Sequence, residues 1–352
     1  MADRVVLTIG TRKGVFVAEA SKPRRSFALR GPFGSGVPVY STLVDTRGTP
    51  RLYASSCNPF FGMKVLCSTN LGKSFKETKS APAFPKDDGR ALANIWSLEA
   101  GDGRKELWCG VEPAALFRSR DGGDSWEMVP GISNHEHARK WQPGAGGLCM
   151  HTIIRDGNRV HLGISTGGHY LSEDGGDTFQ ASNHGVGAGF APDPYPEFGQ
   201  CVHKIARHAD APGRLYMQNH GGWARWDGPG GPRPDIGVLR SDDHGKTWRS
   251  IAKGLPSDFG FPIVVHPHDP DTVYVLPLEP HTRTCPRGAP AVWRSENGGG
   301  SWKRLARGMP KQESYFTVQR DTMDIDELKS PALYFGTTTG QLWIGRDGGE
   351  EW

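Results

Sequence analysis

Three histidines stand out among the residues that could do chemistry. His151 and His203 each lie in a short β-type run, and His220 ends the sequence Gln-Asn-His. Imidazole nitrogens suit zinc, iron or manganese, and a carboxylate such as Glu112 would supply a fourth ligand. No fixed-spacing metal motif such as HExxH accompanies them, and each ring could instead brace a loop by donating to a backbone carbonyl. The histidines therefore predict either no cofactor or one divalent metal ion bound by His151, His203 and His220.

The same side chains could catalyse a reaction without a metal. Glu112 or Glu279 would then act with His151 or His203 as a general acid/base pair. Burial in a protein interior would raise the pKa of the carboxylate, as an acid catalyst requires. Cationic, amide and aromatic side chains nearby in the repeat pattern would hold the substrate. The predicted catalytic residues are Glu112, His151 and His203, and the predicted substrate-binding residues are Arg12, Lys204, Gln218, Asn219, Trp141 and Trp96.

These residues are placed by a repeated sequence of eight residues, whose clearest copy is Ser-Arg-Asp-Gly-Gly-Asp-Ser-Trp at 119–126. Six copies start at positions 68, 119, 172, 241, 295 and 345, so that successive copies are 50 to 69 residues apart. The Asp or Asn can accept hydrogen bonds from its own turn, and the following glycine permits the positive φ of such a turn. The closing Phe or Trp can pack between neighbouring sheets. We interpret the motif as structural.

The segments between the motifs complete a repeating unit of a short β-run, a glycine-bearing loop, a second β-run, the motif and a last strand. Seven such units are predicted, and each is too small to bury a core alone. The chain is therefore predicted to be all-β, a seven-bladed β-propeller of four-stranded sheets. We expect one domain over residues 1–352, with blades starting near 4, 38, 94, 148, 200, 261 and 315. The first and last units look incomplete, which predicts a closing strand beyond residue 352.

Composition excludes several classes of partner. A formal charge of +4 on 352 residues, without runs of Lys or Arg, argues against nucleic acid. No segment approaches eighteen consecutive apolar residues, and the N-terminal segment has no apolar stretch of signal-peptide length, so we expect no membrane association. The six cysteines have no CxxC spacing and are expected to be free thiols. These features favour a cytoplasmic location.

The motif copies at 119, 172 and 241, with the Gly-Thr-Arg-Lys-Gly loop at 10–14, resemble the Asp-box or BNR-repeat proteins. That group includes sialidases, sortilin-type receptors, xyloglucan-specific glycosidases and a photosystem II assembly propeller. Segments 199–204, 218–222 and 259–262 are similar to bacterial propellers labelled glycosyl hydrolase or exo-α-sialidase from their repeats. Sialidases share an Arg-Ile-Pro element and three arginines around the substrate carboxylate. This chain lacks the element and offers only Arg12 near its start, so true sialidase activity is not expected.

The resemblance implies a ligand site at the mouth of the central channel. Repeat position places Arg12, Glu112 and His220 at equivalent turns, with Tyr40 and Trp96 at the starts of innermost strands. Long loops at 132–147 and 184–200, and an insert at 223–237 containing Trp-Ala-Arg-Trp, could wall this site. We expect a hydrolase or lyase acting on a small polar or carbohydrate-like ligand. The alternative is a non-catalytic scaffold propeller that binds a protein partner.

Overall fold

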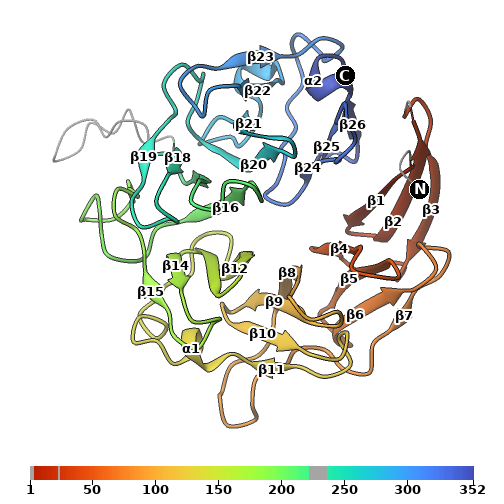
Figure 1. The fold of residues 1–352 in the computed structure, drawn as a ribbon, viewed down its shortest axis with the longest axis vertical. Helices are drawn as coiled ribbons and strands as arrows, with labels where there is room; N and C mark the ends of the chain where they lie inside the picture. Colours follow the sequence, from red (N-terminus) through yellow and green to blue (C-terminus); the bar gives the residue numbers. More distant parts are fainter. Residues whose placement is uncertain (1–3, 23, 222–235) are drawn as a thin grey trace. The chain divides into compact units, whose positions relative to one another are not determined.

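The computed structural model describes residues 4–22, 24–221 and 236–352, and this part of the chain is nearly all β (Figure 1). Its strands form seven small sheets of three or four strands each. Within each sheet the strands are adjacent in chain order, and paired strands run antiparallel. Seven successive up-and-down sheets are the strand pattern of a seven-bladed β-propeller, so the predicted fold class is confirmed.

The first four sheets contain β1 (Arg4–Thr11), β2 (Gly14–Ser21) and β3 (Ala28–Phe33); β4 (Thr42–Asp45), β5 (Arg51–Asn58), β6 (Gly62–Ser68) and β7 (Lys76–Glu77); β8 (Asn94–Ala100), β9 (Leu107–Glu112), β10 (Leu116–Ser119) and β11 (Glu127–Met128); β12 (Cys149–Asp156), β13 (Arg159–Ser165), β14 (Gly168–Ser172) and β15 (Gln180–Ala181). The short helix α1 (Pro130–Ser133) follows β11.

The last three sheets contain β16 (Val202–Arg207), β17 (Leu215–Asn219), β18 (Val238–Ser241) and β19 (Arg249–Ser250); β20 (Gly260–His266), β21 (Asp269–Pro277), β22 (Val292–Ser295) and β23 (Lys303–Leu305); β24 (Met323–Ile325), β25 (Leu333–Gly336) and β26 (Leu342–Gly345). Two single turns of helix, η1 (Pro286–Gly288) and α2 (Arg346–Gly349), accompany them.

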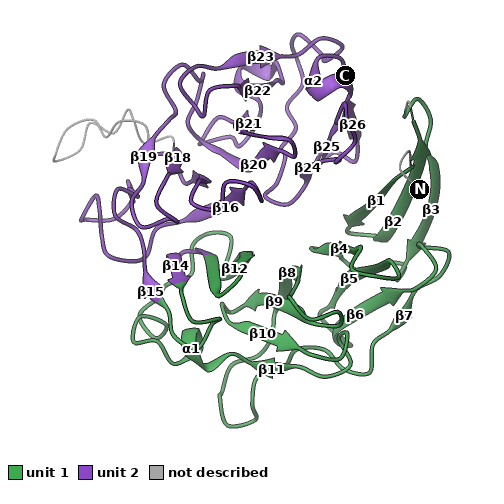
Figure 2. Ribbon diagram, viewed as in Figure 1, with its two compact units in different colours: residues 1–162, 172–179 green, residues 163–171, 180–352 purple. Residues whose placement is uncertain are grey.

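The chain divides into two compact units (Figure 2). The first unit comprises residues 1–162 and 172–179, and the second comprises residues 163–171 and 180–352. The prediction of one domain with the blade starts given above, and of a closing strand beyond residue 352, stays a prediction. Most of the insert expected at 223–237, including its Trp-Ala-Arg-Trp sequence, lies outside the described residues.

The repeated motif makes the hydrogen bonds expected from its sequence. In the second copy Ser119 Oγ donates to Asp121 Oδ1 at 2.9 Å, and the amides of Gly123 and Ser125 donate to Ser119 Oγ and Asp121 Oδ1 at 2.8 and 2.9 Å. The copies starting at 68, 172, 241 and 295 repeat the set. The last copy differs, because Gly345 replaces the serine and Asp347 accepts from Ser330 Oγ instead. The motif is thus a local structural turn in five of its six copies.

The glycine of each motif lets the turn pack tightly on the preceding sheet. Gly72 has a φ of +75°, and a Cβ there would lie 2.5 Å from a methyl group of Val17. At Gly299, with a φ of +94°, a Cβ would lie 2.4 Å from Ile251 Cβ. Any side chain would therefore both strain the backbone and push the two sheets apart.

Candidate functional site

An extra residue interrupts the strand pairing near the start of several innermost strands. In β8, Ile95 pairs with Val111 and Ser97 with Gly110, so that Trp96 is the extra residue on this strand. In β16 the register shifts in the same way at His203, between Val202 and Lys204, and β20 has a shift between residues 260 and 263. A β-bulge of this kind turns a side chain in a new direction and is common beside functional sites.

In the first unit the bulge brings Trp96 to Glu112. Trp96 Nε1 donates to Glu112 Oε2 at 2.8 Å, and Asn94 Nδ2 donates to the same oxygen at 2.9 Å. A Cβ on Gly147, whose φ is +91°, would lie only 2.0 Å from Glu112 Oε1. Because two donors bind it and Gly147 packs closely against it, the half-buried carboxylate is held in one orientation.

An aromatic pair lies beside this carboxylate. The ring centroids of Tyr40 and Trp96 are 4.9 Å apart, with the planes inclined by 50°. Tyr40 is 41 % exposed and Trp96 is partly exposed, so both rings retain surface for a ligand. Exposed rings next to a hydrogen-bond acceptor suit a ligand with apolar faces and hydroxyl groups, such as a sugar.

Three other residues predicted to form the site belong to the first unit: Arg12, Trp141 and His151. Arg12 is exposed in the turn between β1 and β2. Trp141 is only 6 % exposed, which leaves little surface for stacking on a ligand. His151 is 1 % exposed, with Nδ1 at 3.3 Å from Thr152 Oγ1.

In the second unit Cys201, His203 and His220 form a cluster whose potential metal-binding atoms all lie within 4.8 Å of one another. The strand pairing explains the cluster: Cys201 immediately precedes β16, His203 is the bulge residue, and His220 immediately follows β17. The His220 amide donates to the Cys201 carbonyl at 2.9 Å and ties the two chain segments together. The sequence prediction named the two histidines and treated Cys201 as a buried thiol. Its position two residues before His203 is a signal that could have included it.

Each member of this cluster has a neighbour that orients it. His203 Nδ1 is 2.6 Å from the Gly260 carbonyl oxygen, which can only accept, so Nδ1 carries the proton. Ser165 Oγ lies 2.9 Å from Cys201 Sγ. Aromatic rings complete the walls: the ring centroid of His203 is 4.7 Å from that of Phe261.

Burial disfavours the charged forms of His220 and Cys201. Desolvation, with a smaller contribution from the positive charges of Arg283 and Arg320, lowers the pKa of His220 to about 4. Desolvation also raises the pKa of the Cys201 thiol, against the opposing effects of its hydrogen bond with Ser165 and of the same two arginines. An imidazole and a thiol in this environment are neutral near pH 7.

The remaining predicted residues of the second unit mainly brace the protein. Gln218 and Asn219 are buried, and their side-chain amides donate to backbone carbonyls of neighbouring loops. Lys204 forms an ion pair with Asp321. Among the described residues, Cys201 joins His203 and His220 in one group of possible metal ligands, and the role of His151, in the first unit, as a ligand stays a prediction.

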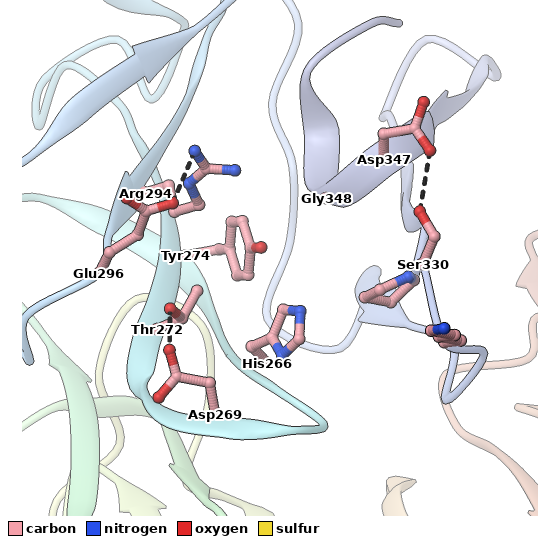
Figure 3. A pocket seen from close by; sticks show the side chains of 11 residues that line it. His266, Asp269, Thr272, Tyr274, Arg294, Glu296, Ser330, Asp347 and Gly348 are labelled. Carbon is pink, nitrogen blue, oxygen red and sulfur yellow. Dashed lines mark hydrogen bonds and ion pairs between the residues drawn. The ribbon is translucent and has the colours of Figure 1, made fainter.

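Two surface grooves lie beside the repeated motif. One, of about 370 Å³, contains the pairs Arg294 with Glu296, Thr272 with Asp269, and Ser330 with Asp347 (Figure 3). The other, of about 450 Å³, is in the first unit. Each is lined by the Asp-Gly of one motif copy, at 347–348 and at 121–122, and by residues of the sheet before it. Because the arrangement recurs with the repeat, we interpret both grooves as gaps between successive sheets.

Comparisons with known proteins point to one class of relatives. No family model matches the chain. A xyloglucanase from Paenibacillus sp is 25 % identical over 300 residues, which cover 78 % of this chain and 26 % of that protein. An oligoxyloglucan-reducing end-specific xyloglucanase from Emericella nidulans is 31 % identical over 80 residues, covering 22 % of this chain and 9 % of that one. The chain thus spans about a quarter or less of the length of these relatives.

Solved structures show the same fold. The GH74 xyloglucanase from Xanthomonas campestris matches 99 % of this chain and 51 % of its own, with a TM-score of 0.65 and 19 % identity. YCF48 bound to D1 peptide matches 99 % of this chain and 89 % of its own, with a TM-score of 0.57 and 15 % identity. The chain is therefore a seven-bladed β-propeller with GH74 xyloglucanase and YCF48 propellers among its structural neighbours. In the described part of the chain, no helix has the length and apolar character needed to cross a membrane.

Proposed function

We propose that this chain is a carbohydrate-binding propeller of the glycoside hydrolase type, of Asp-box architecture, that acts in the cytoplasm. The similarity to xyloglucanases supports a glucan-like ligand. The observation that carries the proposal is the platform formed by Tyr40, Trp96 and Glu112. The six free cysteines agree with a reducing compartment.

The platform offers both kinds of contact that a sugar requires. The exposed faces of Tyr40 and Trp96 can stack on the apolar face of a pyranose ring, at roughly 1 kcal/mol for a well-placed aromatic contact. Glu112 can accept hydrogen bonds from sugar hydroxyls, and hydrogen bonds to a charged acceptor are worth about 1.5–3 kcal/mol. Trp96 contributes to both kinds of contact: its ring can stack on the sugar, and its indole nitrogen orients the Glu112 carboxylate by a hydrogen bond.

Hydrolysis is the reaction that this binding mode would serve. A glycosidase ordinarily uses two carboxyl groups, separated by about 5–5.5 Å in retaining enzymes or about 6.5–9.5 Å in inverting enzymes. Glu112 supplies one oriented carboxyl group at the platform, as acid or base. Arg12, exposed in the turn after β1, would contact an anionic substituent if the ligand carried one.

The test is isothermal titration calorimetry, in which a xyloglucan oligosaccharide is titrated into the purified chain and the Kd is measured. We expect Tyr40→Ala and Glu112→Gln each to raise the Kd about tenfold, which corresponds to loss of about 1.4 kcal/mol. Tyr40→Phe should bind nearly as wild type, because the ring is retained. Tyr315→Ala is the matched control, since Tyr315 is also exposed, at 64 %, but lies in the second unit. Unchanged binding by both Tyr40→Ala and Glu112→Gln would contradict the proposal.

The scaffold alternative has one specific observation in its favour. Phe60 and Phe61 are 89 % and 82 % exposed in the turn between β5 and β6. Their amides both donate to Asn58 Oδ1, at 2.8 and 3.0 Å, so the turn presents two adjacent apolar rings on an ordered support. Exposed apolar surface of this kind marks protein contacts. Failure to bind any glucan, together with partner crosslinking from position 61 but not from position 315, would favour a scaffold.

A further inference from the structure

We infer that Cys201, His203 and His220 bind a divalent transition metal ion, zinc before others. The site lies in the second unit, whereas the residues of the carbohydrate platform proposed above belong to the first. It takes one thiolate and two imidazole ligands, and its fourth coordination position is left for water or an anion.

The spacing of the three donor groups fits one ion. Zinc takes sulfur at about 2.3 Å and imidazole nitrogen at about 2.0–2.1 Å, so two tetrahedral ligands lie roughly 3.5 Å apart. The donor atoms here all lie within 4.8 Å of one another. A shift of each donor atom by about 1 Å toward a common centre, through side-chain rotation, therefore brings all three within bonding distance of one ion.

The backbone holds the ligands ready. The hydrogen bond from the His220 amide to the Cys201 carbonyl, at 2.9 Å, joins the two segments that carry the outer ligands. His203 is the extra residue where the register of β16 shifts, and its ligand atom lies within 4.8 Å of those of Cys201 and His220. Three ligands from two paired strands lose little conformational freedom on binding, because the fold has already ordered them.

Neighbouring groups prepare two of the ligands for a metal. The Gly260 carbonyl accepts the Nδ1 proton of His203 at 2.6 Å, which leaves the Nε2 lone pair as the ligand. Metal-bound histidines ordinarily make such a hydrogen bond with their other nitrogen. Ser165 Oγ, at 2.9 Å from Cys201 Sγ, can donate to a thiolate.

The charge balance can be written out. On binding, the divalent ion displaces the Cys201 thiol proton, which leaves to the solvent, and a metal–sulfur bond forms without any change of oxidation state. The metal with one thiolate and two neutral imidazoles carries a net charge of +1. The positive charges of Arg283 and Arg320, both of which act on His220, add to this field. The positive charge of the site therefore favours an anionic group, such as a carboxylate or phosphate, as the fourth ligand.

The experiment uses the full, untagged chain, purified without chelator. Zinc content is measured by elemental mass spectrometry, and Co²⁺ is titrated into metal-free protein while the thiolate-to-cobalt charge-transfer absorption is followed. We expect one metal per chain and a saturating thiolate band with the wild type. Cys201→Ser should abolish the band, and His220→Gln should weaken Co²⁺ binding at least tenfold. Cys285→Ala removes a different buried thiol of the same unit and should leave both signals unchanged.

Two results would overturn the inference. One is a wild-type chain that binds neither zinc nor Co²⁺ at near-stoichiometric amounts. The other is metal content that Cys201→Ser and His220→Gln leave unaltered. The wild-type cobalt spectrum shows whether any of the six cysteines binds the metal. If Cys201→Ser fails to fold, the comparison of His220→Gln with Cys285→Ala still assigns the band to this cluster or excludes it. Oligosaccharide binding at Tyr40 is a separate measurement, so either proposal can fail without the other.

Discussion

Replacing Asp121 tests the conclusion that the repeated motif is a self-contained turn. Its carboxylate accepts hydrogen bonds from Ser119 Oγ at 2.9 Å and from the amide and hydroxyl of Ser125 at 2.9 and 2.6 Å. Asp121→Ala removes all three, and we expect it to destabilise the turn. Asp121→Asn is the matched control, because Asn70 already occupies this position in the first copy. Asn70 Oδ1 accepts from the Ser74 amide, and Asn70 Nδ2 donates to the Ser74 hydroxyl.

The pKa of Asp121 gives the magnitude. Its hydrogen bond with the Ser125 side chain, followed by bonds from the turn backbone and Ser119, lowers the pKa from 3.8 to about 2. A difference of roughly 1.8 pKa units corresponds to about 2.4 kcal/mol. Because Asp121 is exposed, we discount this for solvent screening to about 1 kcal/mol. The folded-state pKa is the lower one, so this stabilisation is present above about pH 3.8 and is lost as the pH falls through about 2.

Amide hydrogen exchange at Gly123 and Ser125 measures the effect where it arises. This local readout is preferable to a global unfolding curve, since a chain of two compact units need not unfold in two states. In Asp121→Ala, both amides should exchange about fivefold faster near pH 7, as expected for about 1 kcal/mol. Asp121→Asn should stay within twofold of wild type and lose the wild-type change in protection between about pH 4 and pH 2. Unchanged exchange in the Ala variant, or equal acceleration in the Asn variant, would refute the reasoning.

Two further predictions concern packing and ion pairing. Gly110→Ala should destabilise the chain by about 3 kcal/mol in thermal unfolding or prevent folding, because a Cβ would lie 2.2 Å from the Met150 carbonyl oxygen. Gly336→Ala is the control: the nearest atom to its Cβ would be 3.9 Å away, so its stability should lie within about 0.5 kcal/mol of wild type. Arg47→Lys should lower the free energy of unfolding by about 1–2 kcal/mol in the same assay. A lysine cannot make the two hydrogen bonds to Asp45 together with those to the backbone carbonyls of residues 103 and 106. A decrease of less than about 0.3 kcal/mol would contradict this prediction.

Much of the fold could be predicted because its strongest signals are local. The serine, acidic residue and glycine of each motif satisfy one another within eight residues, so residue type and spacing are enough to predict the turn. The recurring β-runs between the turns then implied seven sheets. The last copy shows the limit of the argument: without its serine, the segment at 345–352 forms a different turn, and Asp347 bonds to Ser330 instead.

The candidate sites could be predicted only in part. Repeat position selected Trp96, Glu112, His203 and His220, because equivalent positions in a repeat lie at the same end of their sheets. It gave no account of the bulges at Trp96 and His203, since one inserted residue changes the face a side chain occupies and leaves no clear mark in composition. It treated Cys201 as an ordinary buried thiol, because the contact of Cys201 with His220 depends on the pairing of two strands.

The sequence by itself therefore determined the turns, the number of sheets and the residue types available for chemistry, since these depend on hydrogen bonds and conformational preferences within a few residues. Only the tertiary structure decided which of those residues meet. Glu112 reaches Trp96 and the loop at Gly147, and His220 reaches Cys201, through register and packing between segments that lie sixteen or more residues apart. Such contacts are set by the combined packing of whole strands, because a shift of one residue in any pairing would remove them.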